Sequence, residues 1–253
     1  MNLKDKIRNN ELTIGTWLTI PHLSIVEILA TAKFDWIAID IEHSAIGIES
    51  LMNIIAHIQA ADIKALVRVS SNNEVVLKRV LDAGADGVIV PMIKSKEDAQ
   101  SMINSVYYPP KGNRGVGLSR AQVYGTHFDE YQKRLSDNII IIAQIEHIDS
   151  ISNLDDILSF DEIDATLIGP YDLSASMGFP GKYEMKEVKS VIAKYELLCR
   201  QKNKPAGAHV ISSDFSKTKE KMKAGYRFLA YSLDFFFLGD AAREGMSKLR
   251  NIK

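Results

Sequence analysis

Two carboxylates and an imidazole stand together in Asp40-Ile41-Glu42-His43, directly after an apolar run that begins at Trp36. Such a run is typical of a buried strand, which has no structural use for three ionisable groups at its end. An imidazole suits proton transfer because its ordinary pKa lies near neutral pH. The segment therefore predicts a chemical site where this strand ends.

Glu146 and Asp172 lie one strand-and-helix repeat apart, so they can stand on adjacent strands and point at the same ion. Two carboxylates that leave the other coordination positions of the ion open suit a hard divalent cation such as Mg²⁺ or Mn²⁺. In the alternative reading, Asp172 caps the turn at Leu173-Ser174. Zinc is disfavoured, because Cys199 is solitary and no His-x-x-x-His pair lies on a predicted helix.

Further polar residues end or follow predicted strands. Arg68 ends an apolar strand, where a guanidinium needs an anionic partner: a substrate group or a neighbouring carboxylate. The others are Gln144, His209, Ser232 and Asp234. The glycine-rich loop 112–117 could hold an anion through its backbone N–H groups, but it lacks the Gly-Lys-Ser/Thr ending of a phosphate-binding loop.

Eight strand-and-helix units must position these groups. Strands are predicted at 12–18, 35–41, 63–69, 87–92, 138–146, 163–168, 205–210 and 226–231. The rhythm breaks in the insertion 107–137, which contains Pro109-Pro110 and several glycines and is expected to be irregular.

This pattern favours one α/β domain over residues 1–253, a closed (β/α)8 barrel rather than an open doubly wound sheet. No Gly-x-Gly-x-x-Gly follows an early strand, as a dinucleotide-binding fold would require. In such a barrel the polar strand ends converge on one rim, which is where active sites of this architecture lie.

The composition excludes several classes of function. The formal net charge of -1 offers no general attraction to nucleic acid or to an anionic membrane. No apolar run approaches the length of a membrane-spanning helix, and residues 1–11 lack the apolar core of a secretion signal. With a single cysteine, a cytoplasmic protein is expected.

Ordered motifs along nearly the whole chain resemble the HpcH/HpaI family, the divalent-metal, pyruvate-dependent class II aldolases related to hydroxy-oxo-heptanedioate and 2-dehydro-3-deoxyglucarate aldolases. The motifs are Gly15-Thr16-Trp17, Phe34-Asp35-Trp36, Ile39-Asp40-Ile41-Glu42-His43-Ser44, Val67-Arg68-Val69, Leu81-Asp82-Ala83-Gly84, Val90-Pro91-Met92, Tyr108-Pro109-Pro110-Lys111-Gly112-Asn113-Arg114-Gly115, Gln144-Ile145-Glu146 and Ile168-Gly169-Pro170-Tyr171-Asp172-Leu173-Ser174.

The resemblance implies a barrel of the phosphoenolpyruvate/pyruvate type, with the last helix exchanged between protomers of a homo-oligomer, as in a hexamer. It implies a divalent metal (Mg²⁺, Mn²⁺ or Co²⁺) held by Glu146 and Asp172, with Gln144 beside it. Backbone N–H groups near Gly169, Pro170, Tyr171 and Asp172 would hold the pyruvate carboxylate.

The same resemblance implies that Arg68 holds the carboxylate or enolate of pyruvate and that His43 is the acid/base residue, with Asp40 and Asp82 orienting it. The implied reaction is reversible cleavage of a 4-hydroxy-2-oxo acid to pyruvate and an aldehyde. Tyr107 and Ala45 depart from the family pattern near loops that shape the pocket, so the aldehyde is left open.

Three alternatives remain at this stage. The same scaffold could act on phosphoenolpyruvate or on a CoA-linked acid, or it could bind a 2-oxo acid without catalysis. A Schiff-base aldolase is disfavoured, because Lys64 lies early in its strand, and Lys94 alone keeps that option open.

Overall fold

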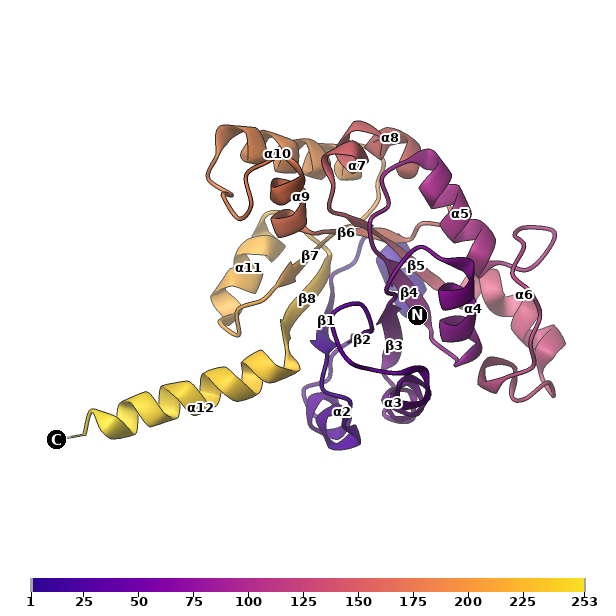
Figure 1. The fold of residues 1–253 in the computed structure, drawn as a ribbon, viewed down its shortest axis with the longest axis horizontal. Helices are drawn as coiled ribbons and strands as arrows, with labels where there is room; N and C mark the ends of the chain where they lie inside the picture. The colour runs from indigo at the N-terminus through magenta and orange to yellow at the C-terminus, as the bar shows by residue number, and fades with distance from the viewer. Residues whose placement is uncertain (1, 253) are drawn as a thin grey trace.

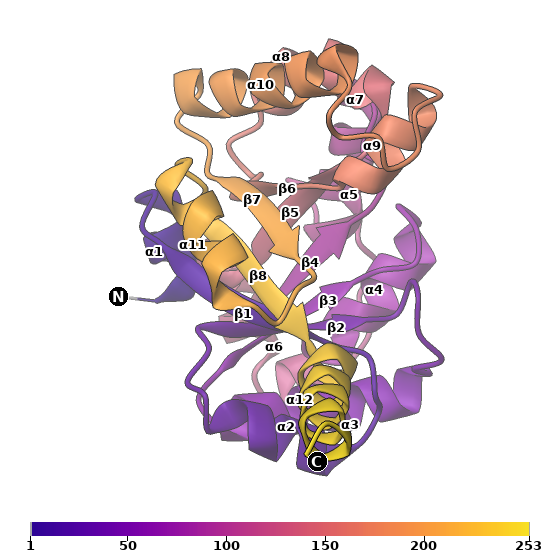
Figure 2. The ribbon, with the colours of Figure 1, turned by 90° about the vertical axis from the view of Figure 1, so that its left-hand side faces the viewer.

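The computed structural model describes residues 2–252 and shows a closed barrel of parallel strands, ringed by helices (Figures 1 and 2). Each strand pairs with the next along the chain, and the first closes onto the last. The strands are β1 (Thr13–Leu18), β2 (Trp36–Asp40), β3 (Lys64–Arg68), β4 (Gly87–Val90), β5 (Ile140–Ile145), β6 (Ala165–Ile168), β7 (Ala206–Val210) and β8 (Phe228–Leu233). The predicted (β/α)8 barrel is confirmed.

Helices follow the strands and cover the outside of the barrel (Figure 1). They are α1 (Leu3–Arg8), α2 (Leu23–Ala30), α3 (Ile48–Ala60), α4 (Glu74–Asp82), α5 (Lys96–Val106), η1 (Arg120–Gln122), α6 (Phe128–Asn138), α7 (Ile148–Ser152), α8 (Leu154–Ile157), α9 (Pro170–Ser176), α10 (Lys186–Gln201), α11 (Phe215–Lys223) and α12 (Asp234–Arg250). No helix described in the structure is long and apolar enough to cross a membrane.

Alternation along the strands divides the core in two. In β5, Ile140 and Ile142 pack inside the barrel, whereas Ile141 packs with the outer layer under the helices. Because both faces of a parallel strand are covered, a continuous apolar run serves two cores at once. The residue that follows Ile142 by two positions, Gln144, therefore also points inward, at the carboxyl end of the strand.

An aromatic pair from the first residues of β2 and β8 fills the amino-terminal layer of the interior. The rings of Trp36 and Phe228 are stacked, with centroids 4.4 Å apart and planes 6° from parallel. Gly15 on β1 makes room for the pair, because a Cβ added there would lie 2.1 Å from the Trp36 ring. The floor beneath the carboxyl ends is therefore solid rather than a channel.

Helix α1 closes the amino-terminal end of the barrel. Its Leu3 and Ile7 join the interior core, and the buried Lys4 ammonium lies 2.9 Å from an Asp164 carboxylate oxygen. The other Asp164 oxygen accepts a hydrogen bond from Arg8 Nε at 2.6 Å. With that end sealed, ligands reach the interior from the carboxyl ends of the strands.

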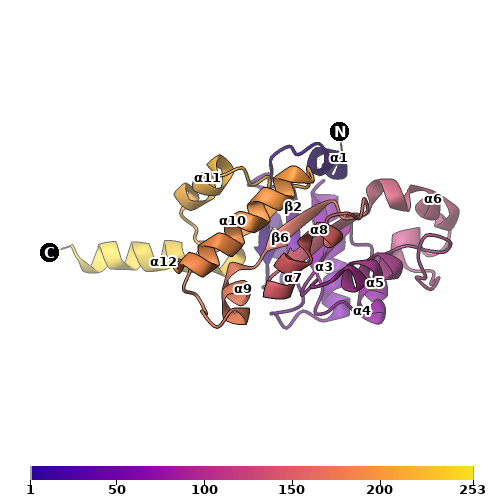
Figure 3. The same cartoon turned by 90° about the horizontal axis from the view of Figure 1, so that it is seen from above.

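The last helix, α12, projects away from the barrel (Figures 1 and 3). It begins at Asp234, whose carboxylate accepts hydrogen bonds from the backbone N–H groups of Thr19 and Ile20 in the loop after β1. Along the projecting part, Leu238 and Leu249 are exposed. Their apolar side chains have no cover from the described part of the chain.

Candidate active site

An ion pair between β2 and β3 is the centre of the candidate site. Asp40 and Arg68 are register partners in the sheet, and both continue the inward face of their strands. Arg68 donates from Nε and Nη2 to the two Asp40 oxygens, at 3.0 and 2.6 Å. Burial alone would raise the pKa of Asp40, but these bonds and the guanidinium charge lower it below its ordinary value.

The imidazole of His43 stands beside this pair and is 70% exposed. Asp40 does not contact the ring; its Oδ1 accepts hydrogen bonds from the backbone N–H groups of Glu42 and His43, and so fixes the turn after β2. The carboxylate near the ring is Glu42, whose Oε2 lies 3.7 Å from His43 Nε2 and 3.4 Å from Arg68 Nε. Sequence reasoning assigned Glu42 no role.

Glu146 is held at the end of β5 by two donors. Its Oε1 accepts a hydrogen bond from the Met92 backbone N–H at 2.8 Å, and its Oε2 accepts one from Gln144 Nε2. Met92 adopts a left-handed backbone conformation, with φ of 56°, to present that N–H group. Burial raises the pKa of Glu146, and the charge of Asp172 raises it further.

The start of α9 is packed directly against Glu146. A Cβ added to Gly169 would lie 2.8 Å from Glu146 Cβ, so this close approach needs glycine. Pro170 occupies the first helical position, and Asp172 lies in the first turn. The backbone N–H groups of a helical first turn are free to bind an anion. Tyr171 points outward and is 57% exposed.

The donors around Glu146 fit a hard divalent cation. Glu146 and Asp172 repel each other, and the buried Oε1 of Gln144 has no hydrogen-bond partner. Oxygen donors with positions left for substrate oxygens and water are what Mg²⁺ and Mn²⁺ bind. Within residues 2–252, no group of three His, Cys, Asp or Glu side chains forms a ready-made metal site, so the substrate would have to complete the coordination.

Asp82 does not lie beside His43 within this chain, and the expectation that it orients His43 stays a prediction. It is the last residue of α4, which runs antiparallel to the strands and ends at the amino-terminal side of the barrel. Asp82 Oδ1 accepts a hydrogen bond from Arg114 Nη2 at 2.5 Å. The Arg114 guanidinium is buried against the rings of Tyr108 and Tyr131. The glycine-rich loop thus keeps its arginine inside and does not offer it to an anion.

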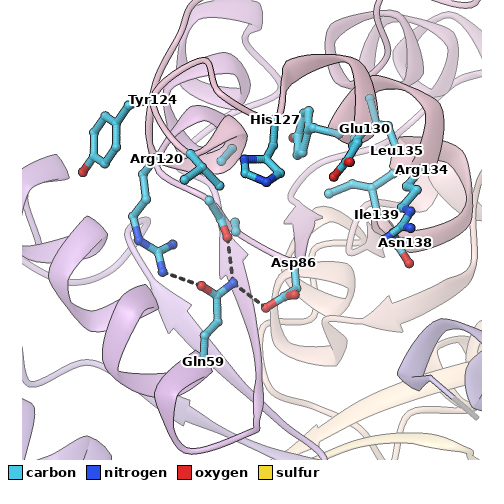
Figure 4. Close-up of a pocket in the computed structure, with 15 residues that line it drawn as sticks. Gln59, Asp86, Arg120, Tyr124, His127, Glu130, Arg134, Leu135, Asn138 and Ile139 are labelled. Carbon is cyan, nitrogen blue, oxygen red and sulfur yellow. Dashed lines mark hydrogen bonds between the residues drawn. The ribbon is translucent and has the colours of Figure 1, made fainter.

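A separate cavity of about 520 Å³ lies near the amino-terminal ends of β4 and β5 (Figure 4). Gln59 spans it, donating to Asp86 and accepting from Arg120. None of the predicted site residues lines this cavity. It is therefore distinct from the cluster around Arg68.

Two interior aromatic side chains complete the cluster: Trp17, which the sequence did not single out, and His209, which the sequence placed at a strand end without a specific role. The Arg68 guanidinium carbon lies 4.5 Å above the ring of Trp17 on β1, and the His209 ring on β7 lies 5.5 Å from Trp17. Alternation could have indicated Trp17 as well, because it falls on the inward face near the carboxyl end of its strand.

The chain is similar to known proteins over nearly its whole length. The family model "HpcH/HpaI aldolase/citrate lyase" matches residues 13–241. A hydroxypyruvate/pyruvate aldolase of Sagittula stellata is 32% identical over 94% of each chain. A 2-keto-3-deoxy-L-rhamnonate aldolase of Escherichia coli is 31% identical over 99% of this chain and 93% of that protein. A crystal structure of an HpcH/HpaI family protein from Burkholderia cenocepacia covers 98% of this chain and 99% of its own, with a TM-score of 0.92 and 29% identity.

Proposed function

This chain belongs to the HpcH/HpaI aldolase/citrate lyase family and is an aldolase, and we propose that it cleaves a 4-hydroxy-2-oxo acid reversibly to pyruvate and an aldehyde at the Arg68 cluster. The observation that supports this most is the meeting of three features at one barrel end. These are the Asp40–Arg68 pair, the exposed imidazole of His43 and the Glu146–Asp172 pair.

Arg68 and the first turn of α9 bind the 2-oxo acid. The guanidinium is fixed by Asp40 and by its stack over Trp17, so its charge is already in place where negative charge develops during cleavage. Backbone N–H groups from Tyr171 and Asp172, at the helix start beside Gly169, receive the carboxylate of the substrate.

Glu146 and Asp172, with Gln144, would hold a divalent cation, on which the family depends. When bound, such a cation supplies Lewis-acid stabilisation of the enolate charge. The bonds from Met92 and Gln144 hold the Glu146 carboxylate in one orientation, which would keep it in place for the cation.

His43 takes the proton from the 4-hydroxyl group during cleavage and returns it during synthesis. The Glu42 carboxylate near its Nε2 would stabilise the imidazolium that forms. Asp40 contributes indirectly, because it fixes the backbone on which both residues stand.

The proposal is tested by pyruvate release from a panel of 4-hydroxy-2-oxo acids, before and after chelation. Activity should disappear with chelator and return with Mg²⁺, Mn²⁺ or Co²⁺. Glu146→Gln should lose the metal response, whereas Glu162→Gln, which alters an ion pair with Lys111 at the other end of the barrel, should keep it. Chelator-resistant turnover would refute the metal site and would favour a lysine Schiff base.

Helix α12 supports a further part of the proposal: that it packs on a second copy of the chain in a homo-oligomer such as a hexamer. Its exposed Leu238 and Leu249 are those that a partner would cover. Light scattering of Leu238→Glu/Leu249→Glu should show smaller assemblies than the unaltered chain. Val116→Glu, at a position with nearly the same exposure, serves as the control.

A further inference from the structure

His209 is placed in the uppermost layer of the barrel interior, beside the proposed site. It lies on β7 with Ala230 of β8 as its register partner, and its neighbour Ala208 packs with the outer layer. Its side chain therefore points inward. The ring lies 5.5 Å from Trp17, which in turn lies under the Arg68 guanidinium.

Two nitrogen atoms in this pair of rings lack partners. His209 Nε2 and Trp17 Nε1 are buried, and neither makes a hydrogen bond with any described residue. Buried polar atoms are nearly always hydrogen-bonded in native proteins. Their position beside Arg68 indicates that a polar group of the substrate satisfies them when the site is filled.

The imidazole is a neutral acceptor. Burial and the charge of Arg68 lower the pKa of His209 to about 4, against smaller opposing contributions from the Ser232 backbone and from Asp40. The hydrogen bond with the Ser232 backbone favours the protonated ring, so in this bond the carbonyl oxygen accepts from a ring N–H. Since Nε2 is unbonded, that N–H belongs to Nδ1, and Nε2 carries the lone pair.

The charges divide the site into two sectors. Glu146 and Asp172 stand at β5 and α9, where the 2-oxo acid end of the substrate is proposed to bind. The sector of β7, β8 and β1 is lined instead by the neutral His209 and Trp17, with Arg68 reaching towards it. This sector, where the Arg68 charge is paired with Asp40, is left for the aldehyde end of the substrate.

We propose that His209 is a specificity residue: its Nε2 accepts a hydrogen bond from a hydroxyl group on the aldehyde part of the substrate. The indole N–H of Trp17 donates to the oxygen of the same group. The enzyme therefore prefers neutral hydroxylated aldehydes to aldehydes without a hydroxyl. A terminal carboxylate or phosphate is disfavoured, because the Nε2 lone pair would face an anionic oxygen that has no hydrogen to donate. This inference rests on the proposed aldolase function.

The test compares pyruvate condensation with glycolaldehyde and with acetaldehyde, which differ by one hydroxyl group. His209→Phe keeps a ring and removes the acceptor, so the ratio of kcat/KM for the two aldehydes should fall about tenfold. His209→Gln, which carries an acceptor oxygen, should restore part of the ratio. His57→Phe, the same substitution on α3, should leave the ratio as in the unaltered enzyme.

A second comparison needs no variant. 2-Fluoroacetaldehyde withdraws electrons as glycolaldehyde does but has no donor, so the unaltered enzyme should use it about tenfold less efficiently. Equal use of the two, or equal losses for both aldehydes in His209→Phe, would overturn the specificity role. Proton exchange at the pyruvate methyl group needs no aldehyde; its absence from the unaltered enzyme would refute the proposed function instead.

Discussion

Arg68→Lys isolates the geometry of the central cation from its charge. In the native pair, Nε and Nη2 of Arg68 contact both oxygens of Asp40, and the side chains are 15% and 4% exposed. The ammonium group of lysine can replace one of the two hydrogen bonds, but it has no planar group to stack over the Trp17 ring. Losing one charge-assisted hydrogen bond costs about 1.5–3 kcal/mol, and losing the stack costs about 1 kcal/mol.

The effect on catalysis should be larger than the charge alone suggests. A positive charge displaced from the developing negative charge is expected to reduce kcat/KM for pyruvate release about 100-fold. The assay couples released pyruvate to lactate dehydrogenase, and urea unfolding reports stability. Arg120→Lys is the matched control, because Arg120 also makes two hydrogen bonds, but in the cavity at the other barrel end. Activity of Arg68→Lys within twofold of the unaltered enzyme would refute the requirement for a planar, paired guanidinium.

Three further predictions concern stability and are checked by denaturant unfolding. Asp164→Asn leaves the buried ammonium of Lys4 without its anion and should lower the unfolding free energy by about 3 kcal/mol or more, whereas an unchanged midpoint would mean that α1 closes the barrel without this pair. Gly15→Ala brings a methyl group into the Trp36 ring and should cost about 1–3 kcal/mol; a neutral effect would contradict the tight packing described there. His209 has a lower pKa folded than unfolded, so its stabilising contribution is complete above pH 6.5 and is lost as the pH falls towards 4. The loss should be roughly 3 kcal/mol in the unaltered chain and absent from His209→Phe, and equal slopes would show that the imidazole is not buried beside Arg68.

The strands could be predicted closely because each carries its own signal. The segment predicted at 138–146 is observed as Ile140–Ile145, and that predicted at 35–41 as Trp36–Asp40. Both are apolar runs bounded by polar residues, and the covered faces of a parallel barrel require such runs.

Helix boundaries depended on partners that are distant in sequence. The sequence pattern predicts one helix over about 150–160, but the chain forms α7 and α8, with a break at Asn153. The Asn153 side chain donates to the backbone oxygen of Lys94, in the loop after β4. Similarly, the sequence pattern predicts the last helix from about Phe237 to Leu249, but α12 begins three residues earlier, because Asp234 binds the loop after β1. Local periodicity does not contain such contacts.

Most residues of the candidate site could be predicted because they stand at the carboxyl ends of strands. Arg68, Glu146 and Gln144 were found by their positions at strand ends, and the structure gathers them with Asp40. Asp82 came from the family resemblance alone. Its place before Gly84, near the end of a helix that leads into β4, already puts it at the amino-terminal side of a barrel.

Charge balance connects the pieces of the site. Asp40, Glu42, Glu146 and Asp172 gather around Arg68, so carboxylates outnumber the guanidinium. Burial raises the pKa of both Glu42 and Glu146. The charge of Glu146 raises the pKa of Glu42 further, and the charge of Asp172 does the same for Glu146. A 2-oxo acid brings a further negative charge into this field. A divalent cation therefore contributes to substrate binding as well as to turnover. Its removal should raise KM in addition to lowering kcat.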